Sequence, residues 1–146
     1  KPKQANLRRA VSSAYYALFH YLIDESCLRA IGTSHAQSPY RHIIARAFPH
    51  AGMKQPCQHF SQGSPQNFPT KIRNRLPASF SIPIEIRDIA AAFIDAQEQR
   101  HIADYDRTEN FSRSRVLTLI NEIESAMQRF AGLPMSDDKR FFLACL

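Results

Sequence analysis

The chain has 146 residues, of which 44% are hydrophobic, and this is enough for one domain with a buried core. Its 19 Lys and Arg residues outnumber its 13 Asp and Glu residues, which gives a formal net charge of +6. No apolar run approaches the roughly 20 residues that a membrane-spanning helix needs, and no secretory signal peptide is recognisable. We therefore expect one domain over residues 1–146, with no membrane segment.

The three cysteines, Cys27, Cys57 and Cys145, are an odd number and show no CxxC spacing. This usage predicts free thiols in a reducing, cytoplasmic environment. The spacing of His50, Cys57 and His59 matches no standard zinc pattern, and the four glycines never cluster into a phosphate-binding loop. We therefore expect neither a metal site nor a cofactor.

The first predicted helix runs from Asn6 to about Arg29, and Gly32 is placed to end it. Apolar residues recur along it at spacings of three and four, which is the pattern of a helix with one buried face; they are Val11, Ala14, Tyr15, Leu18 and Leu22. A second helix is predicted over about residues 38–48, where Pro49 disfavours its continuation.

Residues 52–81 contain most of the prolines, so they are predicted to form a long irregular loop with a short helical turn near 53–60. Long helices are predicted over about 81–105 and 108–131. A short helix is predicted over 136–146, whose apolar end either packs onto the bundle or meets a second subunit. No stretch shows strand alternation. The predicted class is all-α, an antiparallel bundle of four to five helices, with the long loop between the second and third long helices.

The charge is uneven along the chain, because no Asp or Glu occurs between Ser26 and Ile84. Basic residues are frequent in this stretch, and a block of this kind favours polyanions, nucleic acid first. The candidate nucleic-acid-binding residues are Arg41, Arg46, Lys54, Arg73 and Arg75. The alternative interpretation is a solvated loop that happens to lack acidic residues.

Two tyrosines and a histidine stand on the otherwise apolar first helix. Tyr16 and His20 are four residues apart and share a face, whereas Tyr15 belongs to the apolar stripe. Aromatic residues at helical spacing are usually core residues, so we expect a half-buried face whose polar tips reach the surface.

A second polar group of residues lies at the end of the third long helix. Arg100 and Asp104 are one turn apart, and so are His101 and Tyr105. These four residues, together with His50, are the candidate catalytic residues, with Arg100 as a phosphate-stabilising cation and a histidine as acid or base. The alternative is an ordinary surface ion pair, with Tyr105 sealing the helix end.

The stretch Arg8-Arg9-Ala-x-x-x-Ala-Tyr-Tyr-Ala-x-Phe-His, followed by Arg-x-x-Ala-Asp-Tyr-Asp from Arg100, resembles the HEPN domain superfamily. The 46–54 segment is similar to another landmark of one bacterial branch. The resemblance covers about residues 6–130 and implies a helical bundle that forms homodimers. Many members are metal-independent ribonucleases of toxin–antitoxin or phage-defence systems, whereas others partner nucleotidyltransferases or act as non-catalytic binding domains.

Catalytic members of this superfamily carry an Arg, a polar residue and then a His. Here Arg100 and His101 occupy the first two positions, but Ala103-Asp104-Tyr105 stands where the histidine is expected. The resemblance therefore implies a nucleic-acid- or nucleotide-binding module with a degenerate ribonuclease motif. It also implies a homodimer with an RNA or nucleotide ligand, and an antitoxin or nucleotidyltransferase as a further partner. An active endoribonuclease and a helical adaptor for a protein partner remain the alternatives.

Overall fold

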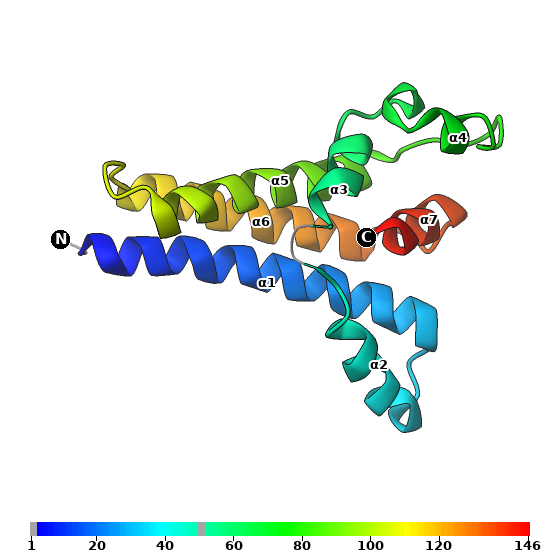
Figure 1. Ribbon diagram of the computed structural model, residues 1–146, viewed down its shortest axis with the longest axis horizontal. Coiled ribbons are helices and arrows are strands. Elements are labelled where there is room, and N and C mark those ends of the chain that lie inside the picture. Colours follow the sequence, from blue (N-terminus) through cyan, green and yellow to red (C-terminus); the bar gives the residue numbers. More distant parts are fainter. Residues whose placement is uncertain (1–2, 50–51) are drawn as a thin grey trace.

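The computed structural model describes residues 3–49 and 52–146, and every regular element within these ranges is a helix. Three long helices, α1 (Gln4–Ile31), α5 (Ile84–Tyr105) and α6 (Arg113–Gly132), lie side by side along the long axis of the molecule (Figure 1). Shorter helices are attached mainly at one end of this trio. The predicted all-α bundle is therefore confirmed. No described helix is both long enough and apolar enough to cross a bilayer.

The core lies where the three long helices meet. The apolar stripe predicted on the first helix is buried in α1 except at Ala14, which is half-buried, and it packs against α5 and α6. The largest fully buried side chains of these helices are Tyr15, Leu18, Leu22, Phe93 and Phe130. Helix α1 ends at Gly32, whose φ of 102° suits glycine and whose N–H donates to the Leu28 carbonyl.

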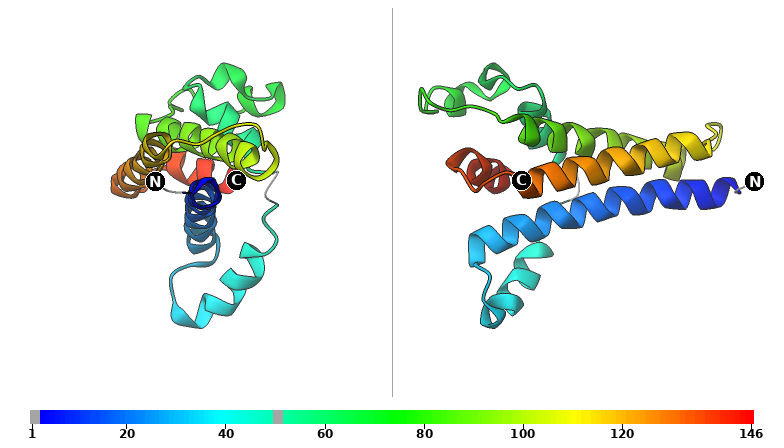
Figure 2. Two further views of the ribbon diagram at one scale, coloured as in Figure 1. Left: turned by 90° about the vertical axis from the view of Figure 1, so that its left-hand side faces the viewer. Right: turned by 180° about the vertical axis from the view of Figure 1, so that it is seen from behind.

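Helix α2 (Ser38–Ala45) follows the short turn η1 (His35–Gln37) and projects away from the trio. Two views show that it lies on the opposite side of the bundle from α4 (Thr70–Arg73) (Figures 1 and 2). Between them in the chain, α3 (Lys54–Ser61) packs against α5.

The helical turn predicted near 53–60 corresponds to α3, and the rest of the 52–81 section is more ordered than the predicted irregular loop. Cys57 and Phe60 form the buried face of α3, and Met53, which directly precedes the helix and is four residues before Cys57, is buried as well. Beyond the turn η2 (Pro65–Asn67), Phe68 is buried as well. The prolines suggested irregular backbone, but the apolar residues between them hold the section against the bundle.

The C-terminal helix α7 (Asp137–Cys145) begins at Ser136, whose hydroxyl accepts from the Lys139 N–H. Its Phe142 is fully buried, with ring centroids 4.9 Å from Phe60 and 5.7 Å from Phe130. Phe141 packs half-buried against the rings of Phe60, Phe68 and Phe80. The apolar end of the chain therefore packs onto the bundle, as the first of the two predicted alternatives states.

Lys139 is buried, although lysine rarely is. Its ammonium donates to the backbone carbonyls of Phe130 at 2.7 Å and Leu133 at 2.9 Å, and it lies 4.4 Å from the centre of the Phe130 ring. It thus binds carbonyls at the end of α6, of which that of Phe130 also accepts from the Leu133 N–H. Burial lowers the pKa of this ammonium.

The three thiols are free, as predicted. Cys27 and Cys57 are buried and Cys145 is half-buried. Burial raises the pKa of each thiol, although for Cys27 the charges of Asp24 and Arg41 also act, in opposite directions. None of the three is therefore an activated nucleophile.

Candidate functional site

Arg100 joins the two polar segments that the sequence singled out. Its Nε lies 2.7 Å from Asp104 Oδ2, one helical turn further along α5. Its Nη2 donates to the Tyr16 hydroxyl of α1 at 3.2 Å. Ser12, one turn before Tyr16, donates from its hydroxyl to Asp104 Oδ1 at 2.8 Å. The predicted ion pair is thus present, and it is also a bridge between α1 and α5.

Aromatic rings support the same guanidinium. The Arg100 Cζ lies 5.7 Å from the centre of the Tyr15 ring and 5.6 Å from that of Tyr16, which is within the range of cation–π attraction. Burial raises the pKa of the Tyr15 hydroxyl, although the Arg100 charge opposes this shift. The Arg100 side chain remains 26% exposed. It is a positioned cation, paired with Asp104, whose side chain is still partly accessible to solvent.

The exposed part of Arg100 opens onto a hollow of about 580 Å³. This hollow is called the Arg100 hollow below, and it is lined by Lys54, Gln97, Glu98, Arg100, His101 and Ile102. Lys54 reaches it from α3 and lies 3.7 Å from Glu98, with the Lys54 side chain 39% exposed and that of Glu98 56% exposed. A pair this long and this exposed contributes little to stability, so the Lys54 ammonium is available to another anion.

His101 and Tyr105 form a second pair on the solvent side of α5. Their ring centroids are 5.0 Å apart, and both residues are exposed. His101 also lines the Arg100 hollow, whereas Tyr105 lies beyond it at the helix end. His20 is exposed too, with its ring stacked at 6.3 Å from Tyr16. The remaining candidate, His50, lies outside the described residues.

The end of α5 is held by Arg8, a residue that the sequence offered only as part of a family resemblance. Its Nη1 donates to the Ala103 carbonyl at 2.8 Å and the Ile102 carbonyl at 3.3 Å, and its Nη2 donates to the Glu109 carbonyl. Nearby, the Gln4 amide exchanges two hydrogen bonds with the backbone of Phe111. Arg8, which belongs to α1, therefore caps the C-terminal end of α5, and no local sequence pattern predicts such a role.

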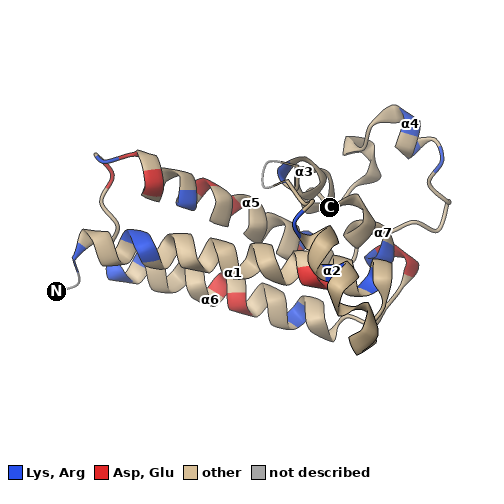
Figure 3. Ribbon diagram, turned by 60° about the horizontal axis from the view of Figure 1, so that its bottom comes forward, with Lys and Arg blue, Asp and Glu red and all other residues tan. Residues whose placement is uncertain are grey.

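The predicted nucleic-acid-binding residues do not share one face. Arg41 binds the backbone of the turn after α1, because its Nη1 donates to the carbonyls of Gly32 at 2.6 Å and Ser34 at 2.9 Å. Arg73 donates to the Gln66 carbonyl at 3.2 Å. Arg46 and Arg75 are exposed, but they follow α2 and α4 on opposite sides of the bundle. Figure 3 shows basic residues dispersed over several elements. Of the predicted set, Lys54 alone lines the Arg100 hollow.

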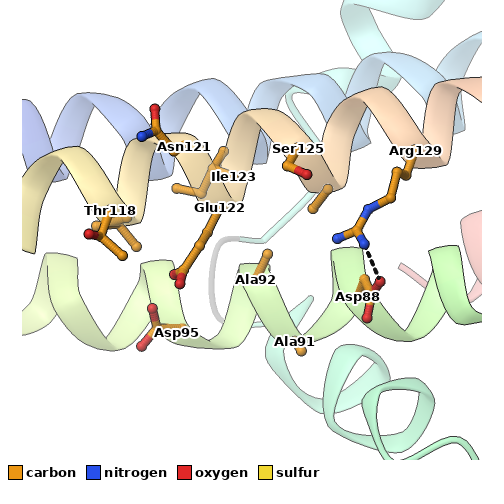
Figure 4. A pocket seen from close by; sticks show the side chains of 12 residues that line it. Asp88, Ala91, Ala92, Asp95, Thr118, Asn121, Glu122, Ile123, Ser125 and Arg129 are labelled. Carbon is orange, nitrogen blue, oxygen red and sulfur yellow. Dashed lines mark ion pairs between the residues drawn. The ribbon is translucent and has the colours of Figure 1, made fainter.

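A second hollow, of about 520 Å³, lies on the seam between α5 and α6 and contains none of the predicted site residues (Figure 4). Asp88 and Arg129 pair across one end of it at 3.1 Å. Further along, the carboxylates of Asp95 and Glu122 point toward one another. This seam is acidic, so it does not favour a polyanion.

Comparisons with protein-family models, with curated proteins and with solved structures found no significant match to this chain. Within the described ranges, no group of three or more His, Cys, Asp or Glu side chains is arranged to hold a metal ion. The Arg100 hollow and its surroundings, with their charged side chains, are therefore the candidate functional site.

Proposed function

We propose that this chain is a HEPN-like domain that binds nucleic acid or nucleotides, in a toxin–antitoxin or defence type of system, with a degenerate ribonuclease motif. One observation carries the proposal: two cations, Arg100 and Lys54, come from different helices and line the same open hollow. Convergent cations in a concave surface are what recognition of a phosphate group requires.

The two cations play different parts. Arg100 is held in place by Asp104 and Tyr16, so little side-chain freedom is lost when it contacts a phosphate. Among the described residues Lys54 is held by its long contact with Glu98, so it can move toward an anion that enters the hollow. A fixed planar cation beside an adjustable one suits phosphates in more than one position along a strand.

The same geometry argues against efficient catalysis. Metal-free cleavage of RNA requires a base for the 2′-hydroxyl, a cation for the phosphorane and an acid for the leaving oxygen. Asp104 is committed to Arg100 and Ser12. Among the described residues that line the hollow, His101 and Glu98 remain beside Arg100 as acid–base groups, and Glu98 already faces Lys54. A metal-independent endoribonuclease is the second candidate function, and this position of His101 is the observation in its favour.

A helical adaptor is the third candidate, favoured by the outer face of α2. Tyr40 and Ile43 are strongly exposed there, and large apolar side chains in that position are suited to a protein partner. Our proposal for partners is a homodimer, in which two copies of the hollow face the ligand, together with an antitoxin or nucleotidyltransferase. Light scattering tests the homodimer: a monomer at high concentration contradicts it.

Binding is tested by titrating a labelled single-stranded RNA in increasing salt and following its anisotropy. We expect affinity to fall steeply with salt, and Lys54→Gln to reduce both the affinity and the salt dependence. Lys71→Gln is the matched control, because Lys71 is exposed on α4 outside the hollow. Equal effects of the two substitutions would contradict a localised site.

Incubation with RNA in EDTA separates the binding module from the nuclease. We expect the RNA to stay intact with the parent and with Arg100→Ala, while Arg100→Ala binds more weakly. Cleavage by the parent that Arg100→Ala abolishes would establish the nuclease instead. Absence of both cleavage and binding would leave the adaptor.

A further inference from the structure

The most exposed large aromatic side chain on α5 is that of Tyr105, which is 67% exposed at the last position of the helix. Its ring is not needed to seal the helix end. Arg8 and the N–H of Asp106 already occupy carbonyls there, and Asp106 in turn accepts from the Thr108 N–H at 2.8 Å. A tyrosine that neither packs in the core nor caps the helix requires another explanation.

Tyr105 has an aromatic neighbour that is also exposed. The His101 imidazole lies 5.0 Å from it at an interplanar angle of 47°, so the two rings form a tilted aromatic pair on the solvent side of α5, called the aromatic surface below. This surface adjoins the Arg100 hollow, because His101 contributes to both. One cation, Arg100, and two exposed aromatic rings thus lie within two turns of α5, and Lys54 adds a second cation from α3.

The spacing suits a nucleotide. Arg100 and Tyr105 are five residues apart, about 7.5 Å along the helix axis and about 140° around it. His101 lies between them, since it lines the hollow with Arg100 and contacts the Tyr105 ring. Within such a distance a sugar can connect a phosphate near Arg100 to a base over the aromatic surface. Every base has a π face that can stack on Tyr or His, and cations beside that face hold the backbone.

We propose that Tyr105 and His101 form a stacking platform for an unpaired nucleobase whose phosphate is held by Arg100 and Lys54. This inference rests on the proposed function and deepens it, since it names the ligand class. In a duplex the neighbouring bases cover both faces of each interior base, so the platform accepts a single strand or a free nucleotide. Both sources present the same chemistry, and the experiment below distinguishes them.

The test measures anisotropy with a labelled single-stranded RNA, with a blunt duplex of the same sequence, and with AMP as a competitor. We expect Tyr105→Ala to weaken single-strand binding about 5- to 150-fold and Tyr105→Trp to retain it. Tyr40→Ala is the matched control, because Tyr40 is 63% exposed on α2, outside the Arg100 hollow, and its loss should leave binding unchanged. Competition by AMP at low concentration would identify a free nucleotide as the ligand, and its failure would identify a strand.

Inorganic polyphosphate, which carries no bases, separates failure of the platform from failure of the binding site. We expect Lys54→Gln to weaken polyphosphate binding and Tyr105→Ala to leave it unchanged. Single-strand binding that Tyr105→Ala does not alter would overturn the platform and leave the binding module standing. Absence of any binding of RNA, AMP and polyphosphate by the folded parent would overturn both. The midpoint temperature of thermal unfolding is measured for each variant. A midpoint equal to that of the parent shows that the substitution acts locally.

Discussion

The two ends of the helix trio are held together in different ways. At one end, α7 and the 62–83 section meet α3 through a cluster of phenylalanine rings around Phe60. At the other end, where α1 begins and α5 turns into α6, Arg8 and Gln4 bind backbone groups of the turn. The Arg100 hollow lies toward the second end. A polar end that is held by directed hydrogen bonds can present fixed charges to solvent, which an aromatic cluster cannot do.

The largest effect is expected at the aromatic end. Phe142→Ala leaves a cavity beside Phe60 and Phe130 and should lower the free energy of unfolding by about 3–5 kcal/mol. Urea denaturation measures this change, and Leu117→Ala, on the exposed face of α6, is the control at about 0.5 kcal/mol or less. A loss at Phe142 as small as the control would contradict the packing described for this end.

At the polar end, Arg8→Met retains the length of the side chain but removes the charged donor to the Ala103 carbonyl. The Ile102 carbonyl loses Arg8 as well but still accepts from the Asp106 N–H. We expect a loss of about 2 kcal/mol in the free energy of unfolding, because hydrogen bonds to a charged group are stronger than neutral ones. Arg9→Met, at an exposed neighbouring position on α1, should change almost nothing. If the two variants unfold alike, Arg8 does not cap α5.

Tyr21 provides a pH-dependent test in the centre of the trio. Burial raises the pKa of its hydroxyl from 10.0 to about 12. The unfolded chain therefore loses this proton first, and the free energy of unfolding should fall as the pH rises from about 10 toward 12. Tyr21→Phe should make the free energy of unfolding decrease less over this range of pH. At neutral pH it should stabilise the protein by about 1 kcal/mol or less, because the buried hydroxyl has no hydrogen-bond partner among the described residues.

Chemical denaturation at several alkaline pH values measures this effect. Tyr105→Phe is the control, because Tyr105 is 67% exposed at the end of α5, whereas Tyr21 packs against the core. Parallel stability profiles for the parent and Tyr21→Phe would show that the Tyr21 hydroxyl is not shielded.

The smallest effect on stability, about 1 kcal/mol or less, is expected for Asp104→Asn, which keeps the shape of the side chain but removes its charge. Its effect on binding should have the opposite sign to that of Arg100→Ala. With Asp104 neutral, the Arg100 charge is less compensated, so RNA should bind a few-fold more tightly and with a steeper dependence on salt. Anisotropy at several salt concentrations measures both quantities. Weaker binding by Asp104→Asn would mean that the ion pair orients Arg100 more than it neutralises it.

The long helices were predictable because their buried residues repeat at helical spacing. The first helix was expected over 6–29 and spans Gln4–Ile31. The helix expected over 108–131 corresponds to α6. The 52–81 section was less predictable, because its prolines suggested irregular backbone. The spacing of Met53, Cys57 and Phe60 was the available signal of a buried helix there.

Only part of the candidate site could be predicted. The Arg100–Asp104 pair follows from a spacing of four residues on one helix. Its contacts with Ser12 and Tyr16 cross more than eighty residues of chain and depend on how α1 meets α5. The use of Arg8, Arg41 and Lys139 to cap backbone carbonyls has no sequence pattern, because any basic residue within reach serves. Net charge along the chain therefore overstated the number of basic residues available to a ligand.

The contacts of Arg8 also bear on how the protein folds and unfolds. They join residues 94 to 101 positions apart, so they form only after α1 has docked on the α5–α6 hairpin, whose own contacts are local. Interactions that are absent from the folding transition state act on the unfolding rate. We therefore expect Arg8→Met to speed unfolding in stopped-flow experiments and to leave the refolding rate nearly unchanged. The polar end that frames the Arg100 hollow would then be the part of the fold that closes last and opens first.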